Sequence, residues 1–191
     1  ATRLGNATVV PGNLTLTSVS GNSVTLGDSA GGSVSVGNLT VNSGGAILVD
    51  GGVVITGTAN LTAADTGATS IADTNTSGRM QVAGVTTLSS AGTILLDGGQ
   101  DFSSVVLNGV SGNTTVYDLN NVTISGNATG AVNVRAGANS VVGVIAAPWA
   151  LTLGNLNAGS LDARAQDGGG GISGNITQAA RSALHIENTA A

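Results

Sequence analysis

The sequence contains no cysteine and no lysine among its 191 residues. The absence of cysteine excludes a disulfide framework and every metal site built on thiolates. The absence of lysine excludes the phosphate-binding loop, which requires a Gly-Lys-Ser/Thr sequence. Five arginines face ten acidic residues, which gives a net charge of −5 and a pI near 4.3. This balance argues against nucleic acid and against electrostatic docking on anionic lipid, because both partners attract basic surfaces.

Aromatic residues and long apolar runs are also scarce. The chain has one Trp, one Tyr and one Phe, while 41% of its residues are hydrophobic. A core of small aliphatic side chains indicates a narrow interior with a repeating cross-section. The apolar run at 141–147 stops at Pro148, far short of the roughly 18 residues that span a bilayer. A chain that starts with Ala1 is interpreted as a mature product or an excised segment.

Internal repeats are the most informative feature that is present. "VTLGDSAGGSVSV" (24–36), "VTISGNATGAVNV" (122–134) and the start of "LTLGNLNAGSLDARA" (151–165) align without gaps. "GGAILVDGG" (44–52) matches "AGTILLDGG" (91–99), and "ITGTANLT" (55–62) matches "VAGVTTLS" (82–89). The offsets of 98, 29, 47 and 27 residues, read as four, one, two and one turns, predict a repeating unit of about 24 to 29 residues.

Within a unit the hydrophobic period is two, which is typical of half-buried strands. The unit 122–150 predicts three short strands at 122–124, 131–135 and 140–146, and Gly, Asn, Asp and Ser mark the corners. Stacked units predict an all-β parallel β-helix (β-solenoid) of seven or eight coils, about 35 Å long, in which residues 1–191 form one domain. Residues 176–191 fit either a terminal strand or a capping helix.

Leu151, Leu153, Leu161 and Ala163 are predicted to lie in the core and Gly159 at a corner, whereas Thr152 and Asp162 are predicted to face solvent.

Catalytic and metal-binding patterns are weak throughout the chain. Asp97 and Asp101 flank "GGQ", and Asp50 occupies the same repeat position as Asp97. These carboxylates suit an acid pair or a calcium site, but aspartate in an Asp-Gly-Gly corner is typical of a turn. The pair Asp162 and Asp167 and the glycine-rich stretch 167–175 have the same two interpretations. The sequence therefore predicts no catalytic residue, metal or cofactor, and His185 is interpreted as a surface residue.

A possible ligand surface is formed by Arg135, Arg164, Asp162 and Trp149. The two arginines share one repeat position and would stack if their units are adjacent, and Asp162 would then relieve their repulsion. A solvated face is the alternative for these charges. Trp149 and Tyr117 are the candidates for an exposed aromatic that binds sugar, and packing at a corner against Pro148 is the alternative for Trp149.

Nine Asn-x-Ser/Thr sequons occur, and five of them are candidate glycosylation sites. The same spacing is also how a polar corner leads into an alternating strand, so the sequons have a structural interpretation as well. The candidates are Asn13, Asn38, Asn60, Asn121 and Asn127.

Residues 82–109, 151–165 and 174–184 ("GNITQAARSAL") resemble the repeat region of large filamentous-haemagglutinin-like exoproteins. The resemblance implies a right-handed parallel β-helix on the bacterial surface, exported through a partner outer-membrane pore and used for adhesion. The chain lacks the Asn-Pro-Asn motifs of that family's secretion domain, and it lacks Arg-Gly-Asp. The role in secretion and any integrin-type binding are therefore not carried over to this chain.

The expected function is a non-enzymatic extracellular rod, structural or adhesive, in a secreted or cell-surface bacterial fibre. Without charged caps its ends are expected to stack end to end with further copies or to continue into more repeats. A host or cell-surface glycan is a possible partner; nucleic acid and a membrane-spanning role are not expected. The alternatives are a polysaccharide-degrading β-helix enzyme and a carbohydrate-binding module.

Overall fold

The computed structural model describes residues 1–5, 8–67, 69–74, 78–137, 149–165 and 174–187. These residues form seventeen strands and no helix, and every pairing between strands is parallel. The predicted all-β class with parallel strands is confirmed. None of the described segments is a helix that could cross a membrane.

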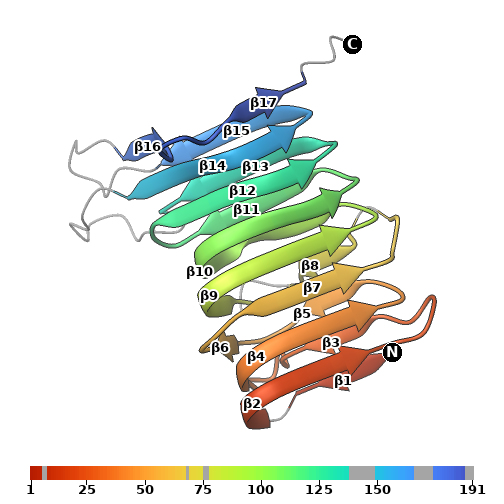
Figure 1. Cartoon of the computed structure of the whole chain (residues 1–191). Helices are drawn as coiled ribbons and strands as arrows, with labels where there is room; N and C mark the ends of the chain where they lie inside the picture. Colours follow the sequence, from red (N-terminus) through yellow and green to blue (C-terminus); the bar gives the residue numbers. More distant parts are fainter. Residues whose placement is uncertain (6–7, 68, 75–77, 138–148, 166–173, 188–191) are drawn as a thin grey trace.

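The strands form two parallel series, here called face A and face B, between which the chain alternates (Figure 1). Face A contains β1 (Thr2–Leu4), β3 (Val24–Leu26), β5 (Ile47–Val49), β8 (Ile71–Asp73), the start of β10 (Ile94–Val110), β11 (Thr114–Asp118), β13 (Ala131–Ala136) and β15 (Ser160–Ala165). Face B contains β2 (Thr8–Thr17), β4 (Val34–Ser43), β6 (Val53–Ile55), β7 (Ala59–Ala63), β9 (Met80–Ser90), the rest of β10, β12 (Val122–Ala128), β14 (Ala150–Ala158), β16 (Asn175–Gln178) and β17 (Leu184–Ile186). One passage along face A and then face B makes one layer, and the described strands form eight layers.

Three of the four repeat offsets are confirmed by the strand register. Ile47 and Ile94 both pair with Ile71, so an offset of 47 residues spans two layers. Ile55 pairs with Val82, and Val122 pairs with Leu151, so offsets of 27 and 29 each span one layer.

The interpretation of the fourth offset, 98 residues, as four turns is wrong. Val24 lies on face A, whereas Val122 lies on face B, so the two outlines run around different corners. The sequence pattern of an alternating strand, a glycine-containing corner and a second strand fits the corner after face A and the corner after face B equally well. The layers are also more variable than predicted: partners in adjacent layers lie as few as 18 residues apart and as many as 29.

Three strands per layer, as predicted, are found in only some of the layers. β5, β6 and β7 are separate strands of one layer, whereas β4 follows the same path as a single strand with a register shift in its pairing with β2. The predicted strands 122–124 and 131–135 lie within β12 and β13. The predicted strand 140–146 lies outside the described residues.

The interior between the faces is a column of aliphatic side chains. β4 alternates between buried and more exposed positions along most of its length, as the period of two predicts. The largest buried side chain is Phe102, the only phenylalanine. Leu151 and Leu153 are buried as predicted, but Leu161 and Ala163 are only half-buried because their strand, β15, lies in the last layer.

The remaining assignments around 151–187 follow the same register. The backbone amide of Gly159 donates to the carbonyl of Gly130 (3.0 Å), so this glycine lies at a corner as predicted. Asp162 is exposed and Thr152 is half-buried on the outer side. Within the described residues 174–187 the C-terminal segment forms two short strands, β16 and β17, and no helix.

Candidate functional site

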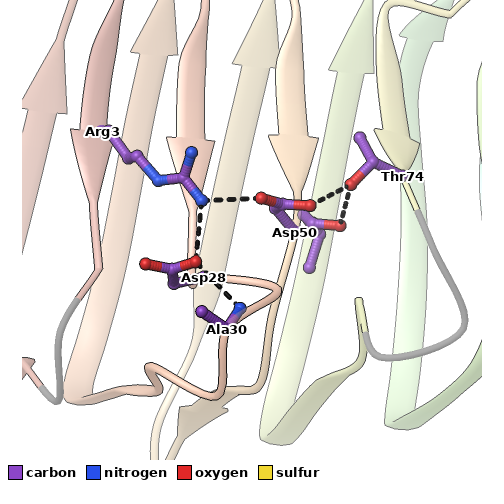
Figure 2. A network of polar contacts seen from close by, with 6 residues as sticks. Arg3, Asp28, Ala30, Asp50 and Thr74 are labelled. Carbon is purple, nitrogen blue, oxygen red and sulfur yellow. Dashed lines mark hydrogen bonds and ion pairs between the residues drawn. The ribbon is translucent and has the colours of Figure 1, made fainter.

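A polar ladder runs along the corner that follows face A in the first four layers (Figure 2). Nη2 of Arg3 lies 3.1 Å from Oδ1 of Asp28 and 2.7 Å from Oδ2 of Asp50. The hydroxyl of Thr74 donates to Oδ1 of Asp50 (2.7 Å), and the amide of Ala30 donates to Asp28 (3.0 Å). The Thr74 hydrogen bond, assisted by Arg3, lowers the pKa of Asp50. The polar ladder connects one residue from each of four successive layers. Its contacts therefore hold these layers together, which is a structural role.

A second set of carboxylates lies deeper at the same corner. Oδ2 of Asp73 accepts hydrogen bonds from the amide of Gly98 (2.6 Å) and from Nε2 of Gln100 (2.7 Å). Oε1 of Gln100, which is fully buried, accepts the amide of Met80 (2.8 Å). Burial, with the neighbouring Asp97 carboxylate, raises the pKa of Asp73 to about 6. These side chains satisfy backbone amides where the chain turns from face A to face B.

Asp118 is the most deeply buried carboxylate that the structure describes. Its two oxygens accept the amides of Phe102 (2.7 Å) and Asn120 (2.9 Å). Burial raises its pKa to about 7, and the nearby Asp101 charge acts in the same direction. Asp101 belongs to the stretch "DGGQD" (97–101), which suggested a pair with Asp97, and no motif in the sequence relates it to Asp118 instead.

The predicted acid pair does not assemble. Asp97 lies beside Asp73, whereas Asp101 accepts a hydrogen bond from Nδ2 of Asn120 (2.8 Å). Asp101 also lines a shallow groove of about 230 Å³ with Val54, Gln81 and Ser103. Asp50 and Asp97 do share a repeat position, since Ile47 and Ile94 are in register through Ile71. Among the described residues no group of three His, Asp or Glu side chains could hold a metal ion.

The predicted arginine stack forms on the outer side of face A. Arg135 and Arg164 are in register, and Asp162 binds Arg164 through two contacts of 2.9 and 2.8 Å. The sequence did not predict the partner of Arg135: its guanidinium lies 4.4 Å from the ring centroid of Tyr117, one layer away. A cation over an aromatic ring is attracted by the ring quadrupole.

Trp149 lies at the corner between β13 and β14 rather than in a described contact with the arginine stack. It is half-buried, packs against the core and occupies the space beside Gly137. This position agrees with a corner residue, and Pro148, its expected packing partner, lies outside the described residues. Asp167, the expected partner of Asp162, also lies outside them. His185 is exposed, points outward in register with Asn157, and lies 3.5 Å from a carboxylate oxygen of Glu187.

The candidate glycosylation sites differ in how their amides are used. Nδ2 of Asn38 donates to Oδ1 of Asn13 (2.8 Å), and Asn38 accepts the amide of Thr58 (2.8 Å). Oδ1 of Asn121 accepts the amide of Ala150 (2.7 Å). Asn60 and Asn127 point outward from face B and are exposed. All five therefore lie at the surface, and three of them also hold neighbouring layers together.

Comparisons of the chain with protein-family models, with curated proteins and with solved structures each returned no match.

Proposed function

We propose that the chain is a stretch of right-handed parallel β-helix that serves as a non-enzymatic rod in a secreted or surface-attached bacterial fibre, like the shafts of filamentous-haemagglutinin-like exoproteins. One observation carries the proposal: parallel pairing continues from β1 to β17 around a single column of aliphatic side chains. In such a stack each layer contacts only its neighbours, so length can grow by adding layers without redesigning the core. At about 4.8 Å per layer, eight layers give a rod roughly 38 Å long.

The two end layers favour axial association. Among the described residues, β1 and β2 pair on one side only, with β3 and β4, and β15 to β17 pair on one side only, with β13 and β14. The last layer also leaves Ile176 48% and Leu184 40% exposed. Unpaired strand edges and exposed core residues are templates for a further strand. A second copy or a continuing chain would bury the same surface.

A specific register suits a second copy. The outward residue of β1 is Arg3, in register with Thr25, and the outward residues of β15 include Asp162 and Arg164. Stacking Leu4 over Ala163 places Arg3 beside Asp162 of the next copy, whereas a shift of two residues places it beside Arg164. Opposite charges across strands favour the first register, and like charges disfavour the second.

The proposal is tested by the mass of the 191-residue chain in solution as its concentration rises. Light scattering should report multiples of 18.2 kDa, and negative-stain images should show rods lengthened along one axis. Leu184→Lys, which places a charge on the open end, should hold the chain at the monomer mass. Val54→Lys is the matched control because Val54 is similarly exposed, at 37%, but lies on a side of the stack. A chain that stays monomeric at every concentration, or equal effects of the two variants, would count against axial stacking.

A further inference from the structure

The outer side of face B presents two columns of side chains that run across the layers, here called the ladder face. One column contains Thr15, Thr40, Asn60, Thr87, Val106 and Ser125. The other contains Thr17, Asn42, Thr62, Ser89, Asn108, Asn127 and Asn157, and ends at His185.

No position of the ladder face carries an aspartate, glutamate or arginine. One described charge lies at the end of a column, where the carboxylate of Glu187 is 3.5 Å from His185. Other described charges lie on other surfaces: Asp50 and Asp97 at the corner after face A, and Arg135 and Arg164 on face A itself. Between Thr17 and Asn157 an ionic ligand would find no counter-charge within the two columns. Nor does the face have an aromatic ring, the usual contact for a sugar. A ligand that fits it is therefore neutral and does not rely on ring stacking.

The spacing of the ladder face is that of a two-dimensional lattice. Along each column the side chains repeat about every 4.8 Å, the distance between paired strands, and the two columns lie about 6.8 Å apart, two residues along a strand. Every layer from the second to the fifth contributes one residue to each column. A single small molecule would contact only a few of these positions, whereas a ligand with its own lattice would contact them all.

The polar groups of the ladder face are mostly free to bind water in this lattice. Within the two columns, the structure describes one hydrogen bond between side chains, from Asn108 to Ser89 (3.2 Å). Hydroxyl and amide groups held at a fixed repeat order the water that they bind. The repeat of oxygen atoms along one axis of hexagonal ice lies close to the strand spacing, and its perpendicular repeat lies close to the two-residue spacing.

We propose that the ladder face binds the surface of ice. Each threonine or asparagine contributes little alone, but contacts held in register act together, as in any multivalent interaction. Hydroxyls and amides keep their hydrogen bonds to water when the ligand is itself water, so no polar group is left unsatisfied. The inference goes beyond the rod proposal and does not depend on it.

The test is partition of the 191-residue chain into a slowly growing ice front, together with thermal hysteresis. The chain should concentrate in the ice fraction at least tenfold over its Thr62→Tyr variant, in which a bulky ring stands up from the middle of the ladder face. Thr25→Tyr, the same change on the outer side of face A, should partition like the parent chain. Thermal unfolding followed by circular dichroism should give similar midpoints for the three proteins.

Three results would overturn the proposal. The first is exclusion of the parent chain from ice. The second is equal loss of partition in Thr62→Tyr and Thr25→Tyr while both remain folded. The third is a concentration-dependent dimer that Thr62→Tyr abolishes without any partition into ice, because the ladder face would then be an interface between two copies of the chain.

Discussion

Replacing Phe102 with alanine is expected to lower the free energy of unfolding by about 3–5 kcal/mol. Phe102 is fully buried and is the largest side chain in the aliphatic column, so its removal leaves a cavity that small neighbours cannot fill. Val82, in register with Phe102 in the preceding layer, would lose packing at the same time. Urea denaturation followed by circular dichroism measures the change.

The control for this prediction is Gln81→Ala. Gln81 neighbours Val82 but points outward, so its loss should change the free energy of unfolding by no more than about 0.5 kcal/mol. A cost below about 1 kcal/mol for Phe102→Ala would mean that the layers do not share one packed column.

Stability is expected to fall as the pH rises from about 4 to 8, the reverse of ordinary acid denaturation. Because burial raises the pKa of Asp118 from 3.8 to about 7, the folded chain binds a proton more tightly than the unfolded chain between these values. The stabilisation is complete below pH 3.8 and is lost as the pH rises through about 7. The difference corresponds to a free energy on the order of 4 kcal/mol. Asp73, with a pKa of about 6, acts in the same direction.

Asp118→Asn isolates the contribution of this carboxyl group. The asparagine oxygen can still accept the amide of Phe102, but the side chain no longer titrates. Urea denaturation across pH 4 to 8 should show a shallower slope for the variant than for the parent chain. Asp50, whose pKa is lowered, titrates below this window and leaves the comparison unaffected. An identical slope in both proteins would show that Asp118 is not the titrating group.

The parts of the fold that the sequence predicts correctly are those set by local alternation. Val24, Leu26, Val34 and Val36 alternate with polar residues and are all buried, as a period of two requires. Which layer a strand joins is a long-range property, and alternation alone does not determine it. For this reason the residues at 24–36 align with those at 122–134, although the two segments turn around different corners.

The polar contacts also divide into those that the sequence predicts and those that depend on which layers lie side by side. The stack of Arg135 on Arg164 could be predicted because both residues hold one repeat position in units one layer apart. The contact between Arg135 and Tyr117 could not be predicted, because these partners in adjacent layers lie 18 residues apart in the sequence, fewer than the expected 24 to 29 residues per unit. The burial of Asp118 and Gln100 could not be predicted, because aspartate and glutamine side chains are mostly exposed in folded proteins.

The in-register stacking of layers is tested most directly by engineered disulfides, since the chain has no cysteine of its own. Asn60 and Thr87 are outward partners in adjacent layers, about 4.8 Å apart, and Val106 is the partner of Thr87 one layer further on. A disulfide requires Cα atoms within about 7 Å of each other. Mild oxidation should therefore cross-link Asn60→Cys/Thr87→Cys fully and leave Asn60→Cys/Val106→Cys reduced, as measured by thiol titration and mass. A reduced first pair, or equal cross-linking of both pairs, would contradict the layered structure.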